Sequence, residues 1–235
     1  MKSILYKANE RGYANHGWLN AKHTFSFAGY YDESKIHFGL LRVLNDDIIA
    51  PAMGFGMHPH DNMEIITIPL SGSIEHKDNT GGHGVISPGE VQVMSAGTGV
   101  YHSEFNASKT EELNLFQIWI FPKERNIKPR YDQKKFSADD RKSKLQVLVS
   151  PVHEGALWIN QDAFLSRIDL HTGEEFVYKN FKSGNGIFTM VIEGEISIEE
   201  NNLARRDAIG ISECEMLSVK SLTNTQLLFI EVPMN

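Results

Sequence analysis

The chain has 235 residues, of which 41% are hydrophobic and 23% are charged. These values are typical of a globular protein and unlike those of a disordered or fibrous chain. The formal net charge of −7 argues against a general binder of nucleic-acid backbones, since such affinity comes from clustered Lys and Arg. We therefore expect no direct nucleic-acid partner.

The chain has a single cysteine, Cys214. One cysteine excludes an internal disulfide and a cysteine-based zinc knuckle, and it fits a reducing compartment. The N-terminal stretch "MKSILYKANERG" lacks the apolar core of a signal peptide, and no run approaches the ~18 apolar residues of a membrane span. We expect a cytoplasmic monomer without a membrane partner.

Short strand-like runs follow one another along the whole chain. Most are β-branched or aromatic and are bounded by Gly, Pro, Asn or Asp, which is typical of strands separated by turns. In chain order they include "IHFGLLRVL", "MEIITIPL", "SIEHKD", "GEVQVMSA", "LNLFQIWIF", "KLQVLVS", "FLSRIDL", "IFTMVIEG", "EISIEE", "AIGIS", "EMLSVKS" and "TQLLFIEVP". The one candidate for a short helix is "SADDRK", near Ser137, which could equally form a loop. The pattern predicts an all-β sandwich or barrel.

A weak internal repeat predicts two copies of one β unit. "TIPLSGSIEH" at 67–76 resembles "MVIEGEISIE" at 190–199, and a turn and an apolar strand follow each of them. A charged, proline-containing stretch lies between the copies. We predict an N-terminal domain over 1–122, a linker over 123–143 and a C-terminal domain over 144–235.

The stretch "GMHPHDNMEI" places His58, His60 and Glu64 in a run that otherwise reads as a buried strand. Because side chains on a strand alternate faces, all three share one face if the strand is unbroken. A lone histidine here would most simply be a hydrogen-bonded core residue. A His-x-His pair in an apolar strand favours a metal site instead, since neutral imidazole is the commonest metal ligand.

A second pair, His102 and Glu104, follows a glycine-rich turn in "SAGTGVYHSEFN". If both pairs point into one barrel, its interior holds three imidazoles and a carboxylate, which are costly to bury unless they bind a cation. Such a set suits one Fe, Mn, Co, Ni, Cu or Zn ion per chain, and six-coordination leaves open positions for a substrate oxygen or O2. The pattern therefore favours a catalytic metal over a closed structural one.

Several motifs together resemble the pirin family of bicupins, close to its bacterial quercetin 2,3-dioxygenase-like members. They are "G-x-x-x-HPH-x-x-x-E" and "SPGEVQVMSAGTGVYHSE", with "NHGWLNAKHTFSF" upstream and "QIWI" and "PRY" downstream. The resemblance implies two jelly-roll cupin barrels packed together. It also implies one metal in the N-terminal barrel, with His58, His60, His102 and Glu104 as ligands.

The carboxylate ligand is a choice between two residues. Generic cupins take it from the place that Glu64 occupies, whereas the pirin pattern places it at Glu104, which we prefer. Glu64 then becomes an inward group that orients a ligand or holds a proton, or else one half of a cross-strand ion pair.

The second half of the chain lacks these motifs, since no His-x-His follows residue 60. An ungapped slide that superposes Gly72 on Gly194 puts Asn180 and Lys182 at the positions of the first pair, and Asn224 and Gln226 at those of the second. We expect the C-terminal cupin to have no metal site and to act as a packing partner.

Other candidate residues have both a functional and a structural interpretation. His76 and His83 are expected to face solvent at a strand edge and in a turn. His23 either lines the mouth of the site or makes a structural hydrogen bond. Four further side chains form either a pocket wall or ordinary core, namely Phe25, Phe27, Gln117 and Trp119.

By resemblance, the leading hypothesis is a metal-dependent dioxygenase that opens a flavonol such as quercetin with O2 and releases carbon monoxide. Glu104, or Glu64 behind it, would be the general base for the 3-hydroxyl group. One alternative is a non-enzymatic, metal- or redox-sensing pirin that binds a transcription regulator. A second is another cupin enzyme, such as an isomerase.

Overall fold

The computed structural model describes residues 1–235, and strands alternate with turns throughout. The only helices are two short 3-10 turns, η1 (Ala8–Glu10) and η2 (Ala138–Arg141). Ser137 caps η2 by accepting a hydrogen bond from the backbone N–H of Asp139. The prediction of an all-β chain is confirmed. No helix has the length and apolar character needed to cross a membrane.

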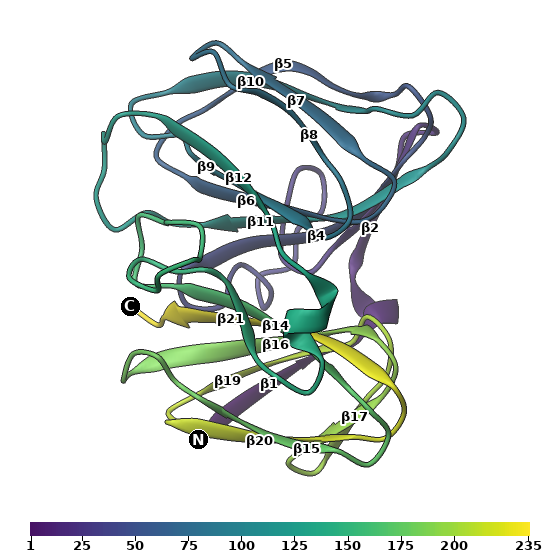
Figure 1. Cartoon of the computed structure of the whole chain (residues 1–235), viewed down its shortest axis with the longest axis vertical. Helices are drawn as coiled ribbons and strands as arrows, with labels where there is room; N and C mark the ends of the chain where they lie inside the picture. Colours follow the sequence, from purple (N-terminus) through teal and green to yellow (C-terminus); the bar gives the residue numbers. More distant parts are fainter.

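The N-terminal half contains two antiparallel sheets that face each other (Figure 1). The larger has the order β12-β9-β6-β11-β4-β3-β2 and consists of β2 (Gly12–Asn15), β3 (Leu19–His23), β4 (Leu41–Ile49), β6 (Glu64–Ser71), β9 (Glu90–Ser95), β11 (Leu113–Ile120) and β12 (Arg130–Lys135). The smaller has the order β5-β10-β7-β8 and consists of β5 (Gly54–His60), β7 (Ile74–Asp78), β8 (His83–Ile86) and β10 (Val100–Asn106).

The C-terminal half repeats this plan. Its larger sheet has the order β1-β19-β16-β21-β14-β13 and consists of β1 (Lys2–Tyr6), β13 (Gln146–Val149), β14 (Phe164–Leu170), β16 (Asn185–Glu193), β19 (Ala208–Ser212) and β21 (Thr225–Pro233). Its smaller sheet has the order β15-β20-β17-β18 and consists of β15 (Glu175–Lys179), β17 (Ile196–Ile198), β18 (Asn201–Leu203) and β20 (Met216–Ser221).

The four sheets lie in layers, with the two larger sheets in the middle and the smaller ones outside (Figure 1). A core of 26 buried apolar residues contains side chains from both larger sheets, among them Ile66 and Phe116 from one and Phe188 and Leu228 from the other. This burial holds the two halves together. The predicted packing of two jelly rolls is confirmed, with facing sheets in place of fully closed barrels.

Two strands pair with neighbours that lie far away in the sequence. β1, at the start of the chain, pairs with β19 of the C-terminal half, and β12 pairs with β9 of the N-terminal half. Each covers a sheet edge that would otherwise expose unpaired backbone groups. β12 falls inside the segment 123–143 that the sequence predicts as a linker, while the domain boundaries themselves remain a prediction.

The strand registers show which residues of the two halves are equivalent. His102 lies opposite His58 on the β10–β5 pair, and Leu217 lies opposite Tyr178 on the corresponding β20–β15 pair. The ungapped slide therefore chose the wrong residues in Asn180, Lys182, Asn224 and Gln226. The reason is the length of the connections between strands. The β5–β6 connection spans 61–63 but the β15–β16 connection spans 180–184, which displaces the first pair, whereas the β7–β8 turn spans 79–82 and the β17–β18 turn only 199–200, which contributes to displacing the second.

The interior of the C-terminal half is filled with apolar side chains. Tyr178, Ile198, Leu217 and Val219 belong to a cluster of 14 buried residues between its two sheets. In the N-terminal half, polar residues take the equivalent places, and this difference locates the candidate site.

Candidate metal site

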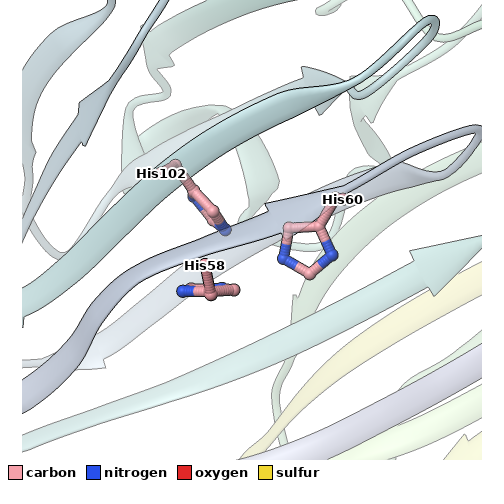
Figure 2. A group of neighbouring side chains, drawn as sticks. All are labelled: His58, His60 and His102. Atoms are coloured by element: carbon pink, nitrogen blue, oxygen red, sulfur yellow. The ribbon is translucent and has the colours of Figure 1, made fainter.

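Three histidines converge inside the N-terminal jelly roll (Figure 2). His58 and His60 come from β5, and His102 comes from β10 directly opposite His58. Their ring centroids are 4.3 Å to 4.8 Å apart. One ring nitrogen of each histidine lies within 4.8 Å of the others, so a single ion can contact all three.

The local sequence of β5 explains this arrangement. His58 and His60 are two residues apart, so a strand presents both on the same face. Pro59 between them cannot donate a backbone hydrogen bond, and β5 is the edge strand of its sheet, where proline is tolerated.

Hydrogen bonds leave the Nε2 atoms of two histidines free to bind a metal. His58 Nδ1 donates to the carbonyl oxygen of Gly56 at 2.8 Å. His102 Nδ1 lies 3.3 Å from His76 Nδ1, and His76 Nε2 lies 2.9 Å from Asp78 Oδ2. Because the Asp78 carboxylate only accepts, His76 donates to it from Nε2 and accepts from His102 at Nδ1.

The electrostatics of the cluster also favour cation binding. His102 Nε2 is buried and has no hydrogen-bond partner, a costly state for a polar atom unless it binds an ion. Burial, followed by the neighbouring histidines, holds the pKa of His102 well below its usual range, and burial lowers that of His60 to about 4. Both imidazoles are thus neutral at pH 7 with a lone pair available.

His76 is a residue of the histidine cluster that the sequence interpretation missed. It was expected at a solvent-exposed strand edge, but it is completely buried and its ring stacks on Tyr131 at 4.5 Å. It points inward because it lies opposite Glu104 on β10, and residues paired across neighbouring strands lie on the same face of the sheet. His83 is exposed as expected and lies 3.2 Å from Glu75.

Glu104 lines the same pocket as the three histidines. Its carboxylate accepts hydrogen bonds from Gln117 Nε2 at 3.0 Å and from Thr67 Oγ1 at 3.4 Å. It lies within 4.8 Å of ring nitrogens of His102 and His76. Burial raises the pKa of Glu104 to about 7, against the effect of both hydrogen bonds.

Glu64 lies away from the histidines. β5 ends at His60, Asn62 has a positive φ of 45°, and β6 begins at Glu64, so the two strands are not one continuous strand. The Glu64 side chain accepts hydrogen bonds from Ser95 Oγ at 2.8 Å and from the backbone N–H of Asn160 at 3.1 Å. It therefore links the two halves, and burial raises its pKa to about 7.

The histidines open into a pocket of about 170 Å³ with aromatic walls. Phe27, Phe55 and Trp119 line it beside Gln117, whereas Phe25 is buried in the core between the halves. The pocket shares Phe27 and Phe55 with an outer cavity of about 640 Å³. Together the two spaces reach the size of a small-molecule site.

Three polar residues on β3 and β4 also contribute to these spaces. His23 lines the outer cavity, and its Nδ1 lies 2.9 Å from Asn45 Oδ1; it thus combines the two roles considered for it. Asn45 and Asp47 line both spaces. Burial, followed by Asp46 and Glu104, raises the pKa of Asp47 to about 8. Their alternation between apolar residues in "LRVLNDDII" is the signal that both side chains face inward.

Each half of the chain matches a protein-family model. Residues 6–120 match the pirin model, and residues 147–232 match the model of the quercetinase C-terminal cupin domain.

Comparison with known proteins finds relatives along the full length. A quercetin 2,3-dioxygenase from Escherichia coli is 43% identical over 97% of this chain and 98% of its own. A putative quercetin 2,3-dioxygenase from Zymomonas mobilis is 41% identical over 93% of each chain. The crystal structure of the bacterial pirin YhhW from Escherichia coli in complex with nickel(II) superposes with a TM-score of 0.93, at 41% identity and 99% coverage of both chains.

Proposed function

The chain belongs to the pirin family, and on this basis we propose that it is a metal-dependent dioxygenase that opens the flavonol ring of quercetin with O2 and releases carbon monoxide. Relatives that are named for this activity match the chain over almost its whole length. The observation that carries the proposal is the convergence of three imidazoles in an aromatic-walled pocket.

We propose that His58, His60 and His102 hold one divalent transition metal, with Glu104 as the fourth ligand. The unpartnered His102 Nε2 fits this role, and the related pirin in complex with nickel(II) supports it. Nitrogen and carboxylate donors of this kind accept Fe, Mn, Co, Ni, Cu or Zn.

When bound, the metal would supply a Lewis acid that makes a nearby hydroxyl group more acidic. Glu104 would then accept the proton of the flavonol 3-hydroxyl group, because its carboxylate lines the pocket beside the three histidines and a positioned carboxylate can act as a general base. Gln117 and Thr67 hold this carboxylate in position through their hydrogen bonds.

The walls of the site suit a flat aromatic substrate. Phe27, Phe55 and Trp119 offer ring faces and edges around the histidines, and aromatic pairs stabilise one another in stacked or edge-to-face contacts. The inner pocket is too small for a whole flavonol, so we place the reacting ring there and the rest of the substrate in the outer cavity.

We further propose that the protein works in the cytoplasm as a monomer, without direct contact to nucleic acid or membrane. The acidic net charge supports the absence of nucleic-acid contact, and the single cysteine fits a reducing compartment.

The test is reconstitution of anaerobically purified protein with each candidate metal, followed by quercetin in air. Loss of quercetin absorbance, O2 uptake and carbon monoxide are recorded together, with the His58→Ala variant beside the wild type. We expect one metal per chain and stoichiometric consumption of quercetin and O2, both lost in the variant. Metal bound at one per chain without turnover under any ion would refute the enzyme and favour a sensing role.

A further inference from the structure

Asp47 is a buried carboxyl residue that faces the site without a hydrogen-bond partner. It is 5% exposed, and its Oδ1 atom is buried and unpaired. Its neighbours across the sheet are Leu115 on β11 and Ala21 on β3, neither of which can donate a hydrogen bond from its side chain. Its environment therefore offers no structural reason for a carboxyl group at this position.

The other buried carboxyl residues of the chain all have partners. Glu231, in the C-terminal half, accepts four hydrogen bonds at 2.9–3.0 Å from two side chains and two backbone N–H groups. Glu64 and Glu104 accept hydrogen bonds from two groups each, and Asp207 from three. Among these buried residues, only Asp47 accepts no hydrogen bond at either carboxyl oxygen, and a buried polar group left in this state calls for an explanation such as binding.

The position of Asp47 indicates what it would bind. It lies in the wall that the inner pocket shares with the outer cavity, to which Asn45, Phe27 and Phe55 also contribute. A flat ring that extends outward from the histidines passes this wall. The polar edge of such a ring would meet the Asp47 carboxyl group and the Asn45 amide, which are two residues apart on the same face of β4.

We propose that Asp47, assisted by Asn45, selects the substrate by hydrogen-bonding one phenolic hydroxyl group of the ring system, other than the 3-hydroxyl group, at the passage between the two spaces. This inference rests on the proposed flavonol activity. A carboxyl group accepts hydrogen bonds when it is ionised and can also donate one when it is protonated, so it can pair with a hydroxyl group in either state. Asp47 is thus a specificity-determining residue outside the metal ligands.

The test compares wild type, Asp47→Leu and Asp47→Asn with quercetin and a series of flavonols that each lack one hydroxyl group. The ratio of kcat/KM for quercetin to that for each analogue measures the contribution of that hydroxyl group. For one position we expect a wild-type ratio of roughly 10 to 100, which falls to about 1 in Asp47→Leu and is partly restored in Asp47→Asn. Ratios for the other positions should stay unchanged.

Stability measurements separate selection from a structural role. Asp47→Leu should melt at or above the wild-type temperature, because it removes an unpaired buried carboxyl group. Glu231→Gln is the matched control, since it should lower the melting temperature without changing any ratio. Equal loss for all flavonols in Asp47→Leu, with unchanged ratios, would overturn the inference.

Anaerobic binding of the same flavonols to nickel-loaded protein distinguishes failure of this inference from failure of the proposed function. If the wild type consumes no flavonol but binds them with an Asp47-dependent preference for one hydroxyl group, the dioxygenase is refuted and the selective role stands. If neither turnover nor binding shows that preference, the inference is refuted.

Discussion

The hydrogen-bonded chain from Asp78 through His76 to His102 gives a sharp prediction for metal binding. Replacing His76 with Phe fills the same space and keeps an aromatic ring against Tyr131, but it removes the acceptor for His102 Nδ1. His102 then has no partner that fixes which nitrogen carries its proton. The metal-binding lone pair on Nε2 is no longer assured.

The structure sets the size of the effect. The lost contact is the 3.3 Å interaction between two buried nitrogens, and partners of metal-ligating histidines typically contribute 10- to 100-fold in metal affinity. We expect His76→Phe to weaken metal binding by about that factor, or roughly 1.4–2.8 kcal/mol. His76→Gln should retain most of the affinity, because its amide can accept from His102 and donate to Asp78.

Competition with a fluorescent chelator for nickel(II) measures these affinities, and circular dichroism of the metal-free proteins checks that each variant is folded. Wild-type affinity in a folded His76→Phe variant would refute the reasoning. Equal weakening in His76→Gln and His76→Phe would show that the imidazole ring itself matters and that its hydrogen bonds do not.

Three further predictions concern the carboxylates of Glu104 and Glu64 and the N-terminal strand β1. Glu104→Gln should lower turnover at least about 100-fold in protein matched for metal content, because it removes the proposed base; unchanged turnover would exclude Glu104 from that role. Glu64 has a native pKa of about 7, above its unfolded value, so its contribution to stability is present in acid and is lost as pH rises through 7. The free energy of unfolding in urea should therefore change between pH 5 and pH 8.5 by up to ~3 kcal/mol less in Glu64→Gln than in wild type. Identical pH profiles of the two proteins would contradict the assignment. Removing residues 1–6 takes Tyr6 out of the interdomain core and uncovers the edge of β19; we expect a lower melting temperature and light scattering from association, whereas unchanged melting would show that β1 is dispensable.

The parts of the site that could be predicted from sequence are those set by local geometry. His58 and His60 converge because a strand repeats every two residues, and a short His-x-His pattern shows this directly. The strand "LNLFQIWI" likewise places Gln117 and Trp119 on one face, and both line the pocket.

The parts that could not be predicted depend on pairing between distant strands. His76 looks like an edge residue until β7 is known to lie between β10 and β8, which makes it internal. Asp47 is seen to lack a hydrogen-bond partner only once its neighbours across the sheet are known, and these are Leu115 and Ala21 on other strands. For Glu64 the error is the reverse, since the sequence placed it with the histidines but the structure places it elsewhere. The turn at Asn62 separates it from the strand to which the local pattern assigned it.

The two halves have the same topology, but only the N-terminal half has a polar interior. At equivalent positions, His58 and His102 in the first half correspond to Tyr178 and Leu217 in the second. Burying imidazoles and carboxyl groups costs stability, whereas the apolar cluster of the second half and the 26-residue core between the halves contribute it. The C-terminal jelly roll therefore stabilises the N-terminal half, whose interior holds polar groups in place of an apolar core. This explains why a half without the histidine motifs remains packed against the site.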